Sequence, residues 1–212
     1  MASLREDGRT NQQQKPFSAD QGLLNKADGS ACFGQGNTVV LAAIYGPCQS
    51  LSSPGLEVAY KESDGSPGAS STEHQRLIAE SLRSVVALSA FPQAVLNCTV
   101  HVLKDDGCAL ATAFNAVTMA LIDSGLEQNG LVTAVCCAIS LKSEILVDPT
   151  TKELETAVAH MTTAWHSVSG EMVACTTSGV LTRVGYRKCV EASKAAAVNV
   201  VAFLRSAYKS RA

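Results

Sequence analysis

The most constraining stretch of the sequence runs from Val95 to Leu121, where an apolar strand pattern passes through an acidic turn into a long helix pattern of small and apolar residues. Between Val95 and Leu103 the side chains alternate between apolar and partly polar, as in a half-buried strand. Asp105-Asp106-Gly107 then forms the turn. A strand that leads into a helix presents free backbone N–H groups, which favour an anion. The two carboxylates, and the absence of Lys or Arg at the helix start, disfavour one.

The rest of the chain predicts two groups of strands, each followed by a helix, over one sheet, which makes a two-layer α+β domain. We expect a turn at Asp28-Gly29-Ser30. Gly34 and Gly36 precede a strand and lack a third glycine, so a turn or bulge is favoured over a dinucleotide site. Residues 150–168 fit a helix or a strand, and the Thr content with the Ser169-Gly170 turn favours a hairpin. Expected strands lie at 15–19, 38–45, 56–60, 95–103, 131–141 and 144–147. We expect three helices. The first is capped by Ser71 or Thr72 and ends at Phe91-Pro92, and the other two span 108–123 and 184–208.

Length, net charge and cysteine content limit the kinds of protein that this chain can be. At 212 residues we expect one domain, residues 1–212, in which residues 1–14 form a mobile polar tail. A net charge of −2 argues against the bulk basic field of an autonomous nucleic-acid binder. Of the eight cysteines, those inside apolar runs predict buried thiols in a reducing compartment: Cys98, Cys136, Cys137 and Cys175. We expect neither a signal peptide nor a membrane span.

Several segments together resemble the RNase PH family of phosphorolytic 3′-to-5′ exoribonucleases. They are DGRT, DGSACFGQGNTVVLAAIYGP, QRLIAESLRSVVAL, FPQAVLNCTVHVLKDDGCALATAFNAVTMALIDSG and LVDPTTKELE, and they span almost the whole chain in the family's order. The resemblance implies an RNase PH-like fold of the ribosomal protein S5 domain 2 type. The pairing of LKDDGCALATAFNA with VDPTTKE is most similar to the family members that form the ring of the eukaryotic exosome.

The resemblance also implies that the active site is lost. Active members carry a Gly-Gly-Thr-Arg turn whose arginine and helix N–H groups hold the attacking phosphate, and here that turn begins at Asp106. The positions of the phosphate arginine, a second basic residue and two aspartates fall on Ala109, Glu80, Leu154 and His160. Because phosphorolysis must neutralise a phosphate dianion beside a phosphodiester, these replacements turn attraction into repulsion. We therefore expect no catalytic residue, no cofactor and no metal.

The expected function is that of a non-catalytic exosome ring subunit that supports assembly and RNA threading for 3′-to-5′ RNA processing and degradation, including that of rRNA. The implied partners are other RNase PH-like subunits in a hexameric ring and single-stranded RNA, with homodimerisation when isolated and no membrane. The implied location is the nucleus, including the nucleolus, and the cytoplasm.

Candidate RNA contacts are Arg76, Arg83 and Lys104, which could touch phosphates without reading sequence. Ordinary solvated helix charges explain Arg76 and Arg83 equally well. Arg5 and Arg9 resemble the family's N-terminal basic motif, which lies near subunit contacts and the RNA entry.

Two other functions stay open. The chain could be an active nuclease, either by residual phosphorolysis or by Mg²⁺-dependent hydrolysis of RNA or DNA at Asp148 with Glu153 and Glu155. It could also be an S5-like module that only binds a ribosome or a protein, which the phosphorolysis-type turn disfavours. His160 and His166 share a strand face but lack a third ligand, so a metal site there is disfavoured.

Overall fold

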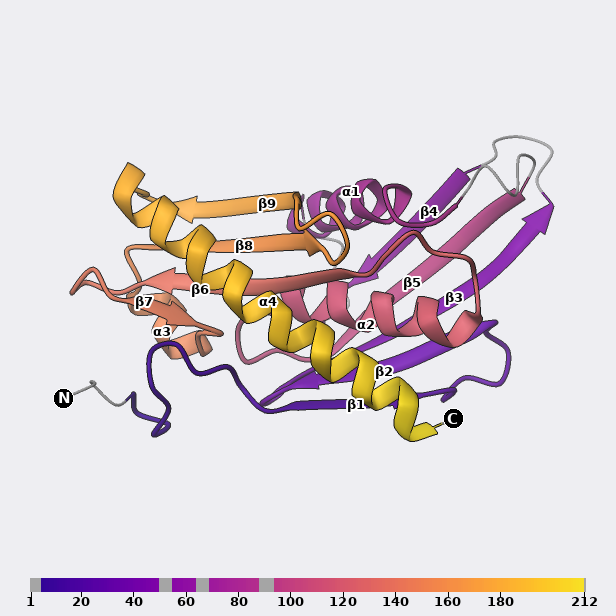
Figure 1. Cartoon of the computed structure of the whole chain (residues 1–212), viewed down its shortest axis with the longest axis horizontal. Coiled ribbons are helices and arrows are strands. Elements are labelled where there is room, and N and C mark those ends of the chain that lie inside the picture. Colours follow the sequence, from indigo (N-terminus) through magenta and orange to yellow (C-terminus); the bar gives the residue numbers. More distant parts are fainter. Residues whose placement is uncertain (1–4, 50–54, 64–68, 88–93, 212) are drawn as a thin grey trace.

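The computed structural model describes residues 5–49, 55–63, 69–87 and 94–211. Their strands form two sheets (Figure 1). The first has the order β1-β2-β3-β5-β4, with only β4 and β5 parallel, and consists of β1 (Phe17–Gln21), β2 (Gly29–Gln35), β3 (Thr38–Gln49), β4 (Gly55–Lys61) and β5 (Ala94–Lys104). The second is antiparallel, has the order β7-β6-β8-β9, and consists of β6 (Val132–Ile139), β7 (Ile145–Val147), β8 (Ala159–His166) and β9 (Met172–Gly179).

Helix α2 (Ala109–Ser124) lies at the centre of the molecule and joins the two sheets. Every residue from Leu110 to Leu121 is buried, as expected for a helix that is apolar on all sides. One side packs on β2 and β3, and another packs on β6 and β8. Asn115 pairs its side chain with the backbone of Ala134 on β6, which satisfies a polar group inside this core.

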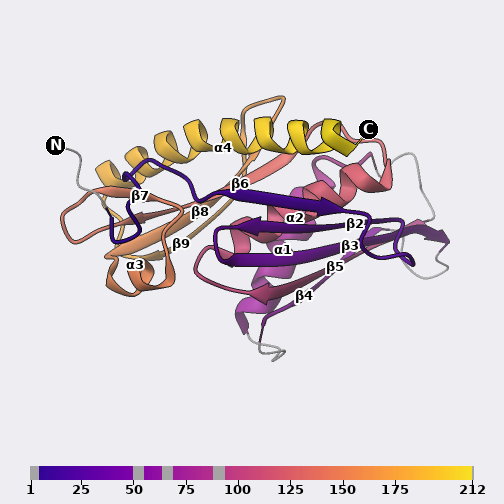
Figure 2. The ribbon, with the colours of Figure 1, turned by 90° about the horizontal axis from the view of Figure 1, so that it is seen from below.

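The other helices cover the outer surfaces. Helix α1 (Ala69–Arg83) packs beside β4, and the short α3 (Thr151–Thr156) follows β7. Helix α4 (Arg183–Arg211) crosses the whole molecule (Figures 1 and 2). Its first half covers β6, β7 and β8. Phe203 in its second half contacts Phe17 of β1 in a tilted arrangement and Phe33 of β2 edge-to-face, with ring centroids 5.3 and 5.9 Å apart. The C-terminal helix therefore ties the second sheet to the first.

Gly29 in β2 allows α2 to pack closely against the strand. A Cβ on Gly29 would lie 2.3 Å from the carbonyl oxygen of Ala120. Any side chain larger than that of glycine would therefore prevent the helix from approaching the strand this closely. We predicted only turns or bulges around Gly29, Gly34 and Gly36. That was wrong for Gly29 and Gly34, which lie inside β2, and right for Gly36, which turns the chain into β3 at φ +61°.

Most predicted elements are present. The alternating face of β5 is confirmed, with Leu96, Cys98, Val100 and Val102 all buried, and so is the β8–β9 hairpin. The prediction of one sheet was wrong, because α2 separates the strands into two. The predicted cap at Ser71 or Thr72 was also wrong, because α1 begins at Ala69. The predicted helix end at Phe91-Pro92 lies outside the described residues.

Helix α3 was not predicted as a separate element. Its capping box, in which the Thr150 side chain accepts from the Glu153 N–H and Glu153 accepts from the Thr150 N–H, nucleates six residues of helix. Cys175 is exposed, contrary to expectation, because β9 is an edge strand. In the described part of the chain no helix is long and apolar enough to cross a membrane.

Residues 5–14 pack against the second sheet. Arg5 donates to the carbonyl oxygens of Val147 and Asn11 at 2.8 and 2.6 Å, and Arg9 donates to that of Asp148 at 3.1 Å. The Val147 N–H in turn donates to Asn11 at 2.9 Å. The segment that we expected to be a tail is thus hydrogen-bonded along β7 and the residues after it.

Candidate functional site

The β5–α2 turn, residues 105–108, is the candidate site, and its backbone is tightly constrained. Gly107 and Cys108 both adopt positive φ, +83° and +66°, a conformation that only glycine takes without cost. A Cβ on Gly107 would lie 2.8 Å from the Pro149 carbonyl oxygen. Cys108, the residue that precedes α2, makes no side-chain cap and instead donates its thiol to that same oxygen at 3.3 Å. The turn is therefore braced against the loop that precedes α3.

The charge of Asp106 is satisfied within the chain. Lys15 donates to its carbonyl oxygen at 2.7 Å and lies 3.7 Å from its carboxylate, to which Asn37 also donates at 3.1 Å. Thr38 fixes the backbone, since its hydroxyl donates to the Gly107 carbonyl oxygen at 2.8 Å and accepts from the Asp106 N–H at 3.0 Å. Asp106, which the resemblance aligns with the start of the family's phosphate turn, thus holds a carboxylate with its own cation.

The surroundings of the turn are acidic. The pKa of Asp105 is raised, chiefly by desolvation and further by the charges of Asp106 and Glu62, while the Gly107 N–H and Lys15 lower it. A hollow of about 290 Å³ opens between the turn and α3. It is lined by four carboxylates, one lysine and one threonine: Glu6, Asp7, Asp106, Glu153, Lys152 and Thr150. This hollow offers a phosphate dianion more repulsion than attraction.

Asp148 lies beneath the turn and is fully buried at positive φ, +50°. Burial raises its pKa to about 6, although the Gln35 side chain, the Lys15 backbone N–H and the charges of Arg9 and Lys15 lower it. Neither carboxylate oxygen has a hydrogen-bond partner of normal geometry among the described residues, nor does the Gln35 Nε2. A buried carboxyl without a bonded partner is costly when it is charged, so the folded protein holds this proton up to a higher pH than an exposed aspartate would.

The cysteine of the turn faces another buried thiol. Burial raises the pKa of Cys108, and a hydrogen bond to Cys136 on β6 raises it further. Cys108 is therefore not activated as a thiolate, which is the nucleophilic and metal-binding form. Instead, the pair forms part of the packing between α2 and the second sheet.

At the four positions that the resemblance aligns with the family's active site, the two basic positions hold Ala109 and Glu80, and the two aspartate positions hold Leu154 and His160. Ala109 begins α2 and is half-buried. Glu80 lies on α1 and forms an ion pair with Arg76 at 2.8 Å. Leu154 lies half-buried on α3, and His160 lies half-buried on β8, where burial lowers its pKa and so favours the neutral ring.

The three candidate RNA contacts are all at the surface. Arg76 and Arg83 lie exposed on α1, seven residues apart, and Lys104 lies exposed at the end of β5. Arg76 is engaged with Glu80, whose hydrogen bond and charge raise the Arg76 pKa. Arg83 and Lys104 remain candidates for an RNA path.

The carboxylates proposed for Mg²⁺ do not form a metal site. Asp148 is buried, whereas Glu153 accepts from the Thr150 N–H and lies 3.7 Å from Arg5. Glu155 is exposed on α3. Across the described ranges, no group of three or more His, Cys, Asp or Glu side chains is placed to hold a metal ion.

Sequence reasoning missed the basic residues that support the turn from a distance. Lys15 approaches it from the start of the first sheet, and Arg9 reaches Asp148 from the N-terminal segment. The DGRT segment carried a signal for Arg9, but nothing near Lys15 marked it as the cation of Asp106. The pairing depends on the β1–β2 register, which brings residue 15 beside the β2–β3 turn.

Residues 13–127 match the family described as "3′ exoribonuclease family, domain 1", RNase PH. The chain belongs to the RNase PH family. Among known members, it is 31% identical to the exosome complex exonuclease RRP46 homolog of Arabidopsis thaliana, over 97% of this chain and 95% of that protein. It is 28% identical to the protein of the same name from rice, over 100% and 98% of the two chains.

Solved structures of RNase PH proteins agree with this assignment. The crystal structure of rice Rrp46 superposes with a TM-score of 0.91 at 28% identity and covers 97% of this chain and 100% of its own. The Archaeoglobus fulgidus exosome, with RNA bound to the active site, has a chain with a TM-score of 0.82 at 21% identity, covering 97% and 92%. The second likeness establishes the fold only. Together they confirm the expected RNase PH-like α+β architecture.

Proposed function

We propose that this chain is a non-catalytic RNase PH-like subunit of the exosome core ring, which supports assembly and RNA threading for 3′-to-5′ RNA processing and degradation, including that of rRNA. The observation that carries the proposal is the β5–α2 turn. In it the phosphate-binding arginine is replaced by Ala109, and the turn begins with a carboxylate already neutralised by Lys15.

The relatives support the exosome assignment. Proteins named as RRP46 homologs match over nearly their full lengths and over nearly all of this chain. Oligomers of related domains need two different contact surfaces on each subunit if they close into a ring. We therefore propose a hexameric ring with other RNase PH-like subunits, a homodimer when the chain is isolated, and a location in the nucleus, including the nucleolus, and in the cytoplasm.

Catalytic inactivity follows from electrostatics. A phosphorolytic site must hold an inorganic phosphate against a phosphodiester and stabilise the charge that develops between them. Each charge-assisted contact that is removed commonly costs about 10²-fold in rate. With Ala109, Glu80, Leu154 and His160 at the four positions, the remaining backbone N–H groups of the helix start are insufficient.

A nuclease assay on the purified chain tests inactivity. End-labelled single-stranded RNA is incubated with phosphate, with Mg²⁺ alone, or with both, and the products are separated. We expect intact RNA in every arm. Phosphate-dependent release of nucleoside diphosphates would refute the proposal, and so would Mg²⁺-dependent monophosphates that disappear in Asp148→Asn.

The nuclease alternative is kept because the plant relatives are named exonucleases. Residual phosphorolysis would have to use the N–H groups at the start of α2. The buried Asp148 has no route to a substrate, which disfavours hydrolysis at that residue.

Ring membership has its own test. The chain is tagged in its native cell, extracts are prepared at about 0.1 M salt, and co-purifying proteins are identified. We expect stoichiometric recovery of other RNase PH-like subunits. Recovery of this chain free of such proteins would refute the ring role, whatever the nuclease assay shows.

A further inference from the structure

Helix α4 has a charge opposite to that of the rest of the molecule. It contains seven basic residues and one acidic residue, a formal charge of +6, although the whole chain carries −2. The remaining 183 residues therefore carry −8. Such an asymmetry concentrates the positive potential of an acidic protein on one element.

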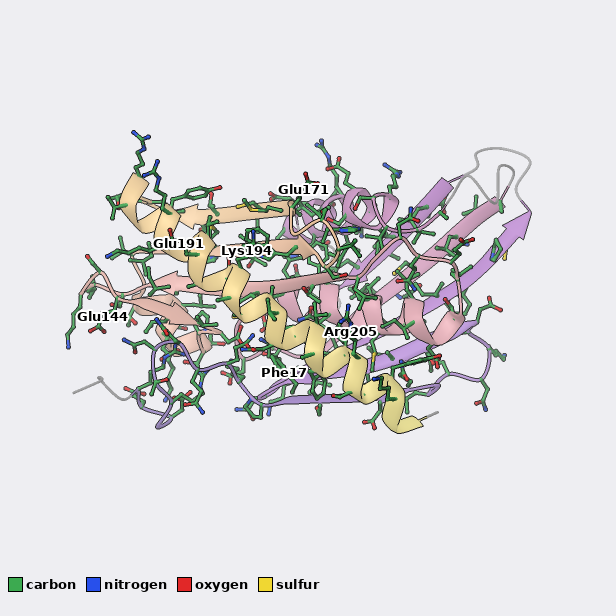
Figure 3. All side chains as sticks on the ribbon, in the orientation of Figure 1. Phe17, Glu144, Glu171, Glu191, Lys194 and Arg205 are labelled. Carbon is green, nitrogen blue, oxygen red and sulfur yellow. The ribbon has the colours of Figure 1, made fainter. Side chains whose placement is uncertain are left out.

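Five of the seven basic residues of α4 form a line along its outer face, which we call the α4 stripe: Arg183, Arg187, Lys194, Arg205 and Lys209. At 100° per residue these positions fall within an arc of about 80°, and at 1.5 Å per residue they span about 39 Å. All five are exposed. Figure 3 labels Lys194 and Arg205 on the α4 ribbon, which lies in front of both sheets in that view.

The charges of the stripe are not neutralised within the chain. Among the residues that the structure describes, no salt bridge involves α4, and Glu191 does not approach a basic side chain within ion-pair distance. Lys194 lies over the Trp165 ring, 5.5 Å from its centroid, a contact that leaves its charge intact. This contrasts with Lys15, Arg5 and Arg9, each of which has an anionic partner.

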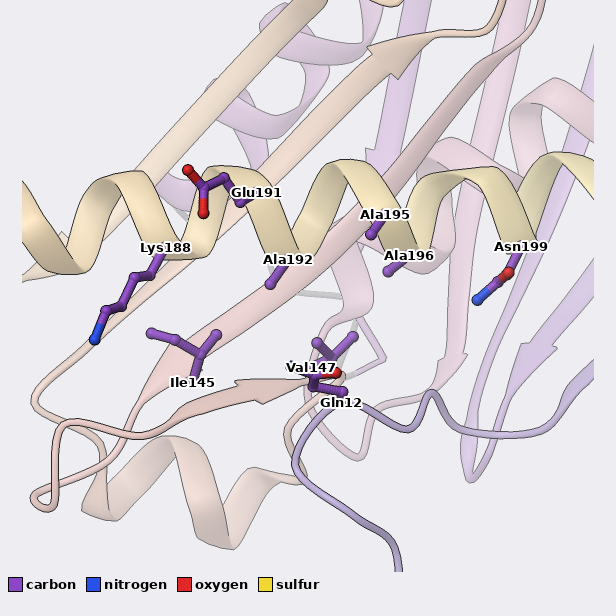
Figure 4. A pocket seen from close by; sticks show the side chains of 9 residues that line it. All are labelled: Gln12, Ile145, Val147, Lys188, Glu191, Ala192, Ala195, Ala196 and Asn199. Atoms are coloured by element: carbon purple, nitrogen blue, oxygen red, sulfur yellow. The ribbon is translucent and has the colours of Figure 1, made fainter. Parts of the chain in front are cut away.

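A groove runs beside the stripe. It lies between α4, β7 and the N-terminal segment, has a volume of about 500 Å³, and is about a quarter turn around the helix from the stripe (Figure 4). Its apolar lining consists of Ile145, Val147 and three alanines of α4, Gln12 and Asn199 add amide groups, and Lys188 and Glu191 add one charge of each sign. Apolar surface with a few amides suits a flat heterocyclic base, whose faces are apolar and whose edges hydrogen-bond.

We propose that the outer face of α4 binds the phosphate backbone of single-stranded RNA, with the adjacent groove receiving bases. The line of uncompensated Arg and Lys side chains provides sequence-independent phosphate contacts. Tyr186 and Tyr208, 37% and 50% exposed near the two ends of the helix, offer aromatic faces for stacking. The choice of RNA over other polyanions rests on the proposed function.

An acidic protein segment fits this face less well. A helical peptide needs a continuous apolar seam with contacts every three or four residues. The exposed valines of the stripe region, Val184 and Val198, are fourteen residues apart, with Glu191 and Lys194 between them. Phosphates require only charge at intervals along the helix, which the stripe supplies.

The test compares two triple variants of the full-length chain with equal charge. The stripe variant is Arg187→Glu/Arg205→Glu/Lys209→Glu, three residues that have no hydrogen-bond or ion-pair partner in the described part of the structure. The control is Lys26→Glu/Lys61→Glu/Lys142→Glu, three exposed lysines on other elements. Both variants move the net charge from −2 to −8. Circular dichroism and thermal melting verify that each is folded.

RNA binding is measured by fluorescence anisotropy with a 5′-labelled 20-nucleotide oligo(U), in EDTA and without phosphate, from about 25 to 200 mM salt. We expect the stripe variant to bind at least about tenfold more weakly than the wild type at low salt. We expect its slope of log affinity against log salt to be smaller by about 2, because each lost contact to a single strand removes about 0.7. The control should stay within about threefold of the wild type.

Three outcomes overturn the inference: no binding by the wild-type chain at low salt, an equal loss in both triple variants, or unchanged binding by the stripe variant. Co-purification with other RNase PH-like subunits is measured in parallel on the same variants. Loss of assembly in the stripe variant alone, with RNA binding intact, would identify α4 as a protein contact. Failure of the wild type to assemble would refute the proposed ring function without altering the RNA result.

Discussion

The β5–α2 turn and the outer face of α4 differ in how their charges are balanced. At the turn, Asp106 has a cation at 3.7 Å and a donor at 3.1 Å, and the backbone is fixed by Thr38 and the Pro149 carbonyl group. On α4, the basic stripe has no anionic partner within the described chain. Satisfied charges stabilise a fold, whereas exposed unsatisfied charges of one sign are available to a partner. The β5–α2 turn, where the charges are paired, is thus a different place from the outer face of α4, where the charges are free for a partner.

The largest effect is expected from closing the space that the turn requires. Gly107→Ala would strain the positive φ and press a Cβ to within 2.8 Å of the Pro149 carbonyl oxygen. We expect a loss of about 2–4 kcal/mol in the free energy of unfolding, measured by urea denaturation. The control is Gly125→Ala at the other end of α2, with φ +69° and nothing within 4 Å, where strain alone should cost about 1 kcal/mol. Equal losses would show that the loop before α3 does not brace the turn.

The buried carboxyl beneath the turn predicts a specific pH dependence. The pKa of Asp148 is raised to about 6 from an ordinary value of 3.8, so the folded state holds this proton more tightly than the unfolded state. The resulting stability is fully present below about pH 4 and is lost as the pH rises through 6.

Asp148→Asn removes the titration while keeping a residue type that tolerates the +50° φ. At pH 7.5 the variant should be more stable than the wild type by up to about 3 kcal/mol, and at pH 4 the two should be nearly equal. Urea unfolding from pH 4 to 8 measures this difference, with Asp20→Asn on β1 as a control for removal of an exposed acidic charge. A difference that does not change with pH would contradict the raised pKa.

Restoring the family's Gly-Gly-Thr-Arg sequence should convert the β5–α2 turn into an anion site. In Asp106→Gly/Cys108→Thr/Ala109→Arg the carboxylate is removed and the arginine restored. We expect phosphate affinity to increase by about 10- to 100-fold, the value of one or two charge-assisted hydrogen bonds, measured by isothermal titration calorimetry. Phosphorolysis should not appear, because the resemblance places Leu154 and His160 at the positions of the two aspartates.

The matched control for the rebuilt turn is Asp106→Gly/Cys108→Thr/Ala109→Gln, which has a long neutral side chain at the last position. Equal phosphate binding by the two variants would mean that removal of the carboxylate, and not the restored arginine, creates the site. No phosphate binding by either would mean that the hollow beside α3, with its remaining carboxylates, still repels the anion.

The sequence predicted the parts of this molecule that depend on local pattern. The alternation in β5 and the small apolar residues of α2 placed both elements within one or two residues of their bounds. The two sheets were not predicted, because the side on which each strand packs against α2 is a tertiary property. The same holds for Gly29 and Gly34, whose role depends on the distance to Ala120 and Ser18. A turn and a close contact have the same sequence signal at a glycine.

The sequence predicted where the candidate site lies but not how its charges are paired and buried. Local spacing located the turn, whereas the four replaced positions, which the family resemblance implies, stay a prediction. The compensation of Asp106 by Lys15, 91 residues away in sequence, could not be read from the pattern. The burial of Asp148 was also missed, because a carboxylate after a short strand looks the same in sequence whether it faces solvent or a core. The basic residues of α4 were visible, but their lack of partners needed the structure.

The smallest effect is expected from breaking the Arg76–Glu80 ion pair on α1. Arg76 is a candidate RNA contact, as the basic residues of the α4 stripe are. The side chains of the pair are 78% and 52% exposed, so solvent screens the pair and its removal should leave the urea midpoint unchanged within error. Glu80→Gln should nevertheless free the Arg76 charge. If α1 contributes to an RNA path, oligo(U) binding should strengthen slightly, by about twofold or less at low salt. Arg76→Gln in the same assay should reverse that gain. An effect as large as that of the α4 stripe variant would place the principal RNA contact on α1 instead of on α4.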